Sequence, residues 1–148
     1  MPSIARLIAL LSAALLLTGC GVFVQPHPDP KLAAELSRFT YPKDAPLGSD
    51  LDIQLVRTGR EHFQLINRMA RSYPPSKVWI NREYVGELDT IKIGPDNYYD
   101  LKRFINKHGE LYQVGALLQP EKSYPIVLAE YIDPATGKRC RMVVRSGD

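Results

Sequence analysis

The chain has 148 residues, with 19 Lys and Arg against 16 Asp and Glu, and a formal net charge of +3. The length is sufficient for one domain with a real core. The charge is too mild for the concentrated basic face of a nucleic-acid-binding protein, so we expect no nucleic-acid partner.

The first twenty residues, MPSIARLIALLSAALLLTGC, combine one cation, an apolar run and a pair of small residues. Arg6 precedes an apolar core from Leu7 to Leu17, and Thr18 and Gly19 follow it. A positive end, an apolar stretch of roughly 7–15 residues and small residues at the cut are the layout of a secretory signal. The run is shorter than the about 20 apolar residues that a membrane-spanning helix needs.

The end of this run, Leu17-Thr18-Gly19-Cys20, resembles the lipobox of bacterial lipoproteins, in which the cysteine is the invariant position. The resemblance implies that the Cys20 thiol takes a diacylglyceryl group and that the signal peptide, residues 1–19, is cut between Gly19 and Cys20. Each buried methylene contributes about 0.8 kcal/mol, so two or three acyl chains hold a protein durably on a bilayer. Gly21 stands where the enterobacterial sorting pattern would have Asp, which favours the outer membrane. The expected location is therefore the cell envelope, with the membrane as a partner.

Removal of residues 1–19, which contain one Arg and no acidic residue, would leave 129 residues with a net charge of +2. Cys140 would then be the only thiol, so no internal disulfide would form. In RCRMVVR, Cys140 and Met142 alternate with Arg139 and Arg141. This alternation predicts a strand whose apolar face buries the thiol.

Residues 20–50 are predicted to form a tether and a short helix. The segment GVFVQPHPDP contains three prolines and is typical of a stiff, non-helical linker. Asp29 as N-cap and Pro30 at the first helical position predict a helix near 30–38. An extended, turn-rich segment follows.

Residues 51–148 show the alternation of β-strands. Apolar residues at period two mark strands beginning at Leu51 and His62, and KVWINREYVGEL predicts a hairpin turning around 81–83. Further strands are expected over 110–118, with Tyr112 and Val114 on one face, over 124–132 as a central strand, and from Arg139 to about Arg145, after a turn in DPATGK.

The predicted fold is mainly β, a β-sandwich or a small barrel. About seven short strands, with Trp79 in an early one, are loosely similar to an immunoglobulin-like antiparallel β-sandwich. No cysteine pair flanks Trp79, so the antibody-type version is excluded.

One segment, DNYYDLKRFINKHGEL, allows two interpretations. Asn97 as a cap, apolar residues at helical spacing and Gly109 as a stop predict a helix. The same residues also fit a strand followed by a single turn, in which IKIG and YYDL are two strands around a Gly-Pro-Asp turn. We favour the strand and turn over 97–108.

No catalytic or metal-binding constellation is expected. His27, His62 and His108 have no second ligand at a metal-binding spacing, so neither a metal nor a cofactor is predicted. Cys140 could act as a thiol nucleophile with His62 or His108 as its base, but the sequence offers little support for this pairing. The acidic cluster Glu83, Glu87 and Asp89 is typical of a charged sheet edge.

The leading function hypothesis is a non-catalytic, lipid-anchored envelope module that binds an envelope protein or a cell-wall polymer. Its candidate partner surface consists of aromatic residues and of outward arginines on the last strand: Trp79, Tyr84, Tyr98, Tyr99, Arg139, Arg141 and Arg145. Two alternatives are a small-ligand or lipid carrier, with a barrel cavity lined by Phe63, Tyr112 and Val114, and a hydrolase acting on the cell wall or a lipid.

Overall fold

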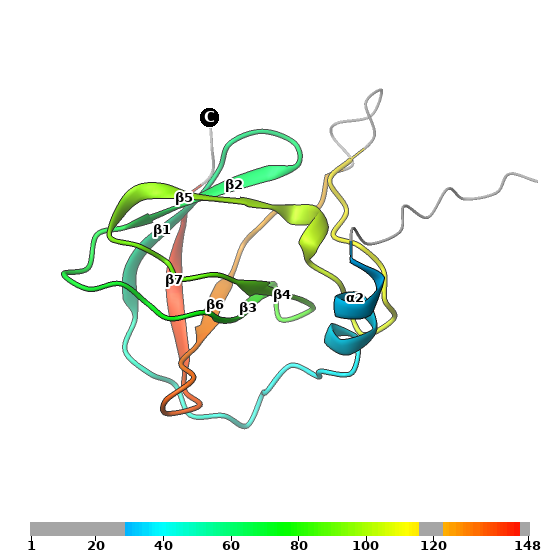
Figure 1. Cartoon of the computed structure of the whole chain (residues 1–148), viewed down its shortest axis with the longest axis horizontal. Helices are drawn as coiled ribbons and strands as arrows, with labels where there is room; N and C mark the ends of the chain where they lie inside the picture. The colour runs from blue at the N-terminus through cyan, green and yellow to red at the C-terminus, as the bar shows by residue number, and fades with distance from the viewer. Residues whose placement is uncertain (1–28, 116–122, 146–148) are drawn as a thin grey trace, which may run out of the picture.

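The computed structural model describes residues 29–115 and 123–145 and shows a β domain with one short α-helix (Figure 1). The signal peptide, the lipidation position and the prolines at 26 and 28 lie outside the described residues. The elements are α2 (Pro30–Leu36), β1 (Leu51–Arg57), β2 (His62–Asn67), β3 (Ser76–Ile80), β4 (Tyr84–Leu88), β5 (Gly94–Asp100), the 3₁₀ turn η1 (Leu101–Arg103), β6 (Ala129–Ile132) and β7 (Arg139–Arg145).

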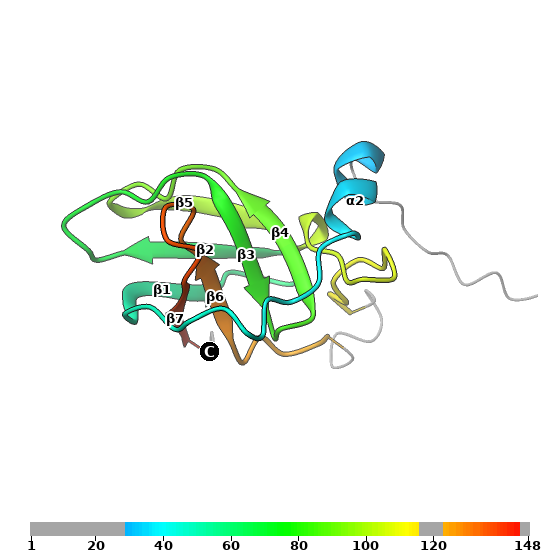
Figure 2. The ribbon, with the colours of Figure 1, turned by 90° about the horizontal axis from the view of Figure 1, so that it is seen from below.

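The seven strands form one hydrogen-bonded sheet in the order β4-β3-β6-β7-β1-β2-β5, which curls around the core (Figures 1 and 2). Every neighbouring pair is antiparallel except β1 and β7, which run parallel. The mainly β prediction is therefore confirmed. The immunoglobulin-like antiparallel sandwich is not, because the described strands belong to a single sheet and one pair is parallel.

The chain after β5 links the two edges of the sheet. β5 leads through η1 to Ile105, whose N–H and carbonyl pair with the Val85 carbonyl and N–H of β4, at 3.0 and 2.8 Å. The absence of a side chain at Gly86 permits this crossing, because a Cβ added there would lie only 2.8 Å from the Phe104 ring. The strands thus enclose the core almost as a small barrel does.

The enclosed side of the sheet is filled with side chains. Phe63 is 0% exposed, stacks on Tyr99 with ring centroids 5.5 Å apart, and meets Phe104 at 5.7 Å. Tyr112 is 2% exposed and donates a hydrogen bond from its hydroxyl to the Tyr124 carbonyl at 2.7 Å. Phe63 and Tyr112, two of the residues expected to line a carrier cavity, lie in this core, and the partly buried Val114 packs against it.

Helix α2 lies beside the β3–β4 end of the sheet (Figure 2), where it packs against Trp79 and Val85 on the outer side of β3 and β4. The Asp29 carboxylate accepts hydrogen bonds from the backbone N–H groups of Lys31 and Leu32, which confirms the predicted N-cap. Leu36 packs with Trp79 and Val85 in a second apolar cluster. Trp79 points away from the main core and is nevertheless 4% exposed, because the helix and the segment after it cover the ring.

Several local predictions are confirmed. The β3–β4 hairpin turns over residues 81–83, as predicted, with positive φ angles at Asn81 and Arg82, 53° and 62°, between the paired Ile80 and Tyr84. The segment 97–108 is a strand followed by one turn, as favoured. β7 buries Cys140 and Met142 and exposes Arg141. The strand predicted over 124–132 lies inside the sheet as β6, but it begins only at Ala129.

Two local predictions are wrong. The Gly-Pro-Asp tripeptide at 94–96 begins β5 rather than forming a turn, because Gly94 pairs with Asn67 of β2. Residues 110–115 form no strand, and only Leu111 makes an isolated bridge, to Ile105. Tyr112 is held instead by its backbone bond to Phe104 and by its hydroxyl. The rest of the expected strand lies outside the described residues.

Candidate functional site

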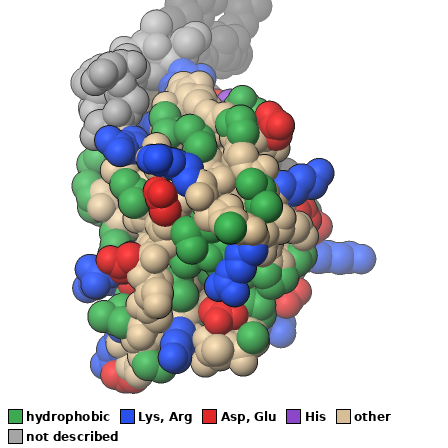
Figure 3. Space-filling model, turned by 90° about the vertical axis from the view of Figure 1, so that its left-hand side faces the viewer, with side chains coloured by type: hydrophobic (Ala, Val, Ile, Leu, Met, Phe, Trp, Pro, Cys, Tyr) green, Lys and Arg blue, Asp and Glu red, His purple; other side chains and the backbone are tan. Residues whose placement is uncertain are grey.

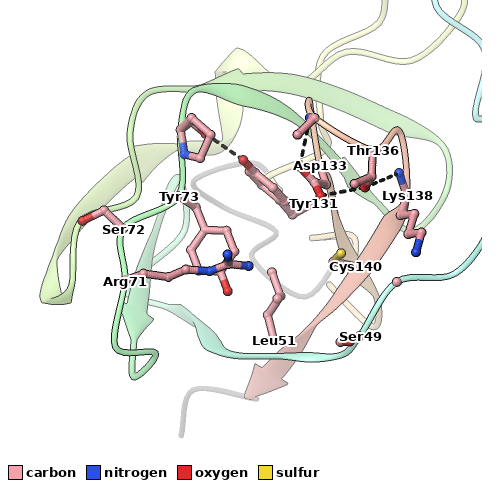
Figure 4. Close-up of a pocket in the computed structure, with 13 residues that line it drawn as sticks. Ser49, Leu51, Arg71, Ser72, Tyr73, Tyr131, Asp133, Thr136, Lys138 and Cys140 are labelled. Carbon is pink, nitrogen blue, oxygen red and sulfur yellow. Dashed lines mark hydrogen bonds between the residues drawn. The ribbon is translucent and has the colours of Figure 1, made fainter.

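A hollow of about 500 Å³ opens beside the turn between β6 and β7 (Figure 4). Three segments form its wall: residues 48–51 at the start of β1, residues 71–74 before β3, and residues from Tyr131 to Cys140 around the β6–β7 turn. We call it the Tyr73 hollow. The parallel pairing of β1 with β7 brings the first and third segments together.

Two tyrosines form the floor of the Tyr73 hollow. Their rings meet edge to face, with centroids 5.5 Å apart. The Tyr131 hydroxyl donates to the Pro74 carbonyl at 2.9 Å, and burial raises the pKa of Tyr131 to about 12. The Tyr73 hydroxyl is buried and has no hydrogen-bond partner of normal geometry in the described part of the chain.

The Arg71 guanidinium lies over the Tyr73 ring, 4.9 Å from its centroid (Figure 4). The neighbouring Tyr73 hydroxyl raises the pKa of Arg71, although the two groups do not meet with the geometry of a hydrogen bond. Such stacking of a cation on an aromatic face stabilises one position of the guanidinium. The side chain is exposed, so its donors remain available at the rim.

The carboxylate in the hollow, Asp133, holds the β6–β7 turn. It accepts hydrogen bonds from the Thr136 hydroxyl at 2.6 Å and from the Ala135 N–H at 3.0 Å. These bonds hold the pKa of Asp133 below its usual range. The turn closes at Gly137, which has a φ of 67° and donates its N–H to the Asp133 carbonyl at 2.7 Å. Sequence reasoning had identified only the turn.

Cys140 lines the same hollow but is a poor nucleophile. The side chain is 8% exposed, as predicted for a buried thiol. Burial raises the pKa of the Cys140 thiol, and the nearby Asp133 carboxylate adds to the rise, so the thiol is protonated at neutral pH. A Cβ at Gly48 would lie 2.5 Å from the sulfur, so only glycine fits there.

The predicted thiol–histidine pairs are not formed around this hollow. His62 lies in β2 opposite Asp100, and His108 follows η1 and lines a different hollow. Neither is among the residues that line the space beside Cys140. The candidate acidic cluster, Glu83, Glu87 and Asp89, lies exposed along β4 and its flanks, as a charged sheet edge does.

A second hollow, of about 480 Å³, lies where the segment after α2 meets the β3–β4 turn and the loop at 106–108. Its aromatic wall is Tyr41 and Trp79, whose rings meet edge to face at 5.5 Å. Arg82 approaches the Tyr41 ring at 5.8 Å, and His108 lies on the opposite loop. This hollow therefore combines aromatic faces with basic side chains.

A buried polar triad fastens Tyr41 to the sheet beneath it. The Glu130 carboxylate, 1% exposed, accepts a hydrogen bond from the Tyr41 hydroxyl at 2.6 Å. Its other oxygen lies 3.6 Å from a guanidinium nitrogen of Arg139, an ion pair without a hydrogen bond. Arg139 also donates to the Tyr41 hydroxyl and, at 3.0 Å, to the Ala45 carbonyl. Each member is thus held by the other two.

The predicted partner surface divides into buried and exposed residues. Trp79 and Tyr84 are 4% exposed and Tyr99 is 8% exposed, so these three rings belong to the packed structure. Arg139 is engaged in the triad. Tyr98, Arg141 and Arg145 remain exposed, and Tyr98 is 64% exposed. Sequence alternation identified which side of a strand each residue occupies but not what covers that side.

The exposed members lie on one face of the sheet. Arg145 of β7 pairs with Val56 of β1, which pairs with Gln64 of β2, which pairs with Tyr98 of β5. These four residues form one row across four strands, and Gln64 donates a hydrogen bond to the Tyr98 hydroxyl at 3.0 Å. Val143, 40% exposed, extends the same face. We call it the open sheet face, in contrast to the outer side of β3 and β4, where Trp79 and Val85 pack against α2.

Charges are mixed over the surface. On the face seen in Figure 3, Lys and Arg side chains are interspersed with Asp and Glu. Arg141 lies 3.4 Å from Asp50, and Arg68 lies 3.7 Å from Asp52. Among the described residues, no group of three or more His, Cys, Asp and Glu could hold a metal ion.

Little in the sequence indicates the Tyr73 hollow, and neither Arg71 nor Tyr73 is among the predicted site residues. The usable signal was a cation two residues before an aromatic residue, next to prolines that prevent regular strand pairing.

No described helix is long and apolar enough to cross a membrane. Comparisons of the chain with protein-family models, with curated proteins and with solved structures found no match.

Proposed function

We propose that this chain is a lipid-anchored protein of the cell envelope whose β domain is a non-catalytic binding module. The observation that carries the proposal is the sequence Leu17-Thr18-Gly19-Cys20 at the end of an apolar N-terminal run. The anchor would be a diacylglyceryl group on Cys20, with the outer membrane as the expected site. The proposal needs a β domain on an anchor and does not depend on the immunoglobulin-like assignment.

The packing of the domain is consistent with binding rather than catalysis. Cys140 is the described thiol, and burial raises the pKa of its thiol, which disfavours nucleophilic attack. Phe63 and Tyr112 fill the space that a carrier cavity would need. These contacts leave the outer surfaces of the domain as its means of interaction.

The open sheet face is the surface we propose for an envelope partner. It combines an exposed aromatic ring, Tyr98, with Val143 and with the cations Arg141 and Arg145. Tyrosine and arginine are enriched in protein interfaces, and arginine binds carboxylate or phosphate groups of a partner or polymer. On β3 and β4, the outward side chains Trp79 and Val85 are instead buried against α2 and the segment after it.

The anchor is tested by replacing each cysteine separately. In Cys20→Ser the acylated sulfur is lost, so we expect the precursor to remain unprocessed and incorporation of a labelled fatty acid to disappear. Cys140→Ala is the matched control, since the residue is buried in β7 and should leave labelling and membrane fractionation unchanged. Processing and fatty-acid labelling of Cys20→Ser at the level of the unmodified chain would contradict the proposal.

The partner surface is tested with a photo-crosslinking residue in living cells. At Tyr98 and at Val143, both on the open sheet face, we expect the same discrete adduct. The control position is Glu87, which is exposed on β4 at the other edge of the sheet. Adducts that are equally strong from Glu87, or absent from both test positions, would refute this surface.

A further inference from the structure

We propose that the Tyr73 hollow binds a monocarboxylate with an apolar body, whose carboxylate pairs with the Arg71 guanidinium and whose body packs on Leu51 and Tyr131. This ligand site is separate from the open sheet face. It does not depend on the lipid anchor.

The first step is the state of Arg71. Its guanidinium is exposed at the rim and positioned over the Tyr73 ring, and no carboxylate of the described residues lies within ion-pair distance of it. A positioned, unpaired guanidinium presents a planar fork of donors that matches a carboxylate. Little side-chain entropy would be lost on binding, because the stacking already restricts the side chain.

The second step is the Tyr73 hydroxyl beside it (Figure 4). The residue is 4% exposed, and its hydroxyl finds no hydrogen bond of normal geometry among the described groups. A buried polar group in this state needs an explanation, since nearly all such groups are satisfied. A carboxylate held on Arg71 would supply an acceptor next to this hydroxyl.

The third step is the charge of the ligand. Arg71 and Lys138 bring two positive charges to the wall, and Asp133 brings one negative charge that is committed to its turn. In the described structure Lys138 makes no ion pair either. The wall thus carries a net charge of about +1, which a monoanion neutralises, whereas a phosphate dianion would leave a second negative charge uncompensated beside Asp133.

The fourth step is the apolar body. Between the cations the wall consists of Leu51, the two tyrosine rings, Pro74 and the protonated Cys140 thiol. The volume of about 500 Å³ lies within the usual range for small-molecule sites. A flat or branched apolar group attached to the carboxylate would fill this space.

The test is a titration of the full chain, purified in a mild detergent, with phenylacetate, phenylacetamide and phenyl phosphate, followed by ligand-observed NMR against the detergent alone. We expect phenylacetate to bind and the neutral amide and the dianion to bind more weakly. Arg71→Gln should weaken phenylacetate by about tenfold or more, the usual cost of a lost charged hydrogen bond. Lys138→Gln should weaken it by about threefold, as a charge that is not in contact does.

Arg141→Gln is the matched control, since Arg141 is exposed on β7 outside the hollow, and it should leave phenylacetate binding unchanged. Both substituted side chains in the hollow are exposed, so equal thermal unfolding midpoints will show that the variants fold. Absence of phenylacetate binding, equal binding of the amide, tighter binding of phenyl phosphate, or full affinity in Arg71→Gln would each overturn the proposal. The lipid-anchor test reads acylation and processing, so the two proposals fail independently.

Discussion

At the scale of single residues, the floor of the Tyr73 hollow holds two tyrosines that differ in the hydrogen bonding of their hydroxyl groups. Both rings are buried and touch each other, and the Tyr131 hydroxyl donates to the Pro74 carbonyl. The Tyr73 hydroxyl has no acceptor among the residues that the structure describes. The chain therefore contains its own comparison between a satisfied and an unsatisfied buried hydroxyl.

This difference predicts unequal costs for the same substitution. Tyr131→Phe should lower the free energy of unfolding by about 1 kcal/mol, because one buried hydrogen bond is lost. Tyr73→Phe should change it by less than about 0.5 kcal/mol, or raise it, because an unsatisfied polar atom is removed and the ring remains. Chemical denaturation of the two variants measures both values. A larger loss in Tyr73→Phe than in Tyr131→Phe would show that the Tyr73 hydroxyl has a partner in solution.

At the scale of elements, sequence reasoning succeeded where local chemistry determines the structure. Asp29 before Pro30 fixes the start of α2, and the alternation through Cys140 and Met142 fixes which side of β7 is buried. The strand–turn interpretation of 97–108 succeeded for a similar reason. Asp100 caps η1 by accepting from the Lys102 N–H at 2.8 Å, and Leu101 and Phe104 are both buried.

Sequence reasoning failed where contacts between segments far apart in the chain determine the structure. Alternation shows that Trp79 lies on the outer side of β3, yet it cannot show that α2 covers that side. The parallel pairing of β1 with β7 joins segments about ninety residues apart, and no local signal encodes it. Because the Tyr73 hollow is built by that pairing, its residues were not recognisable as a group.

At the scale of the whole molecule, the segment between α2 and β1 is fastened to the sheet at a few points. Gly48 donates its N–H to the Arg139 carbonyl at 2.8 Å, and the Arg139 N–H donates to the Pro46 carbonyl at 3.0 Å. A further attachment is the triad of Tyr41, Glu130 and Arg139. In a lipid-anchored chain, this segment would also carry any force between the anchor and the β domain.

The triad therefore predicts a large effect from a small substitution. Glu130→Gln removes the buried negative charge and leaves Arg139, whose side chain is only 11% exposed, without its ion partner. Loss of one member of a buried pair costs about 3–5 kcal/mol, so we expect a drop near the lower end, because the amide can still accept from Tyr41.

The matched control for Glu130→Gln is Asp50→Asn. This substitution breaks the exposed ion pair with Arg141, which lies on β7 as Arg139 does, and it should lower the free energy of unfolding by at most about 1 kcal/mol. Denaturant titration gives both free energies. Limited trypsin digestion gives a second readout, because a loosened segment should be cut faster at Arg38 and Lys43, which are both exposed. Equal free energies and equal cleavage rates in the two variants would mean that the buried triad does not fasten the N-terminal segment to the sheet.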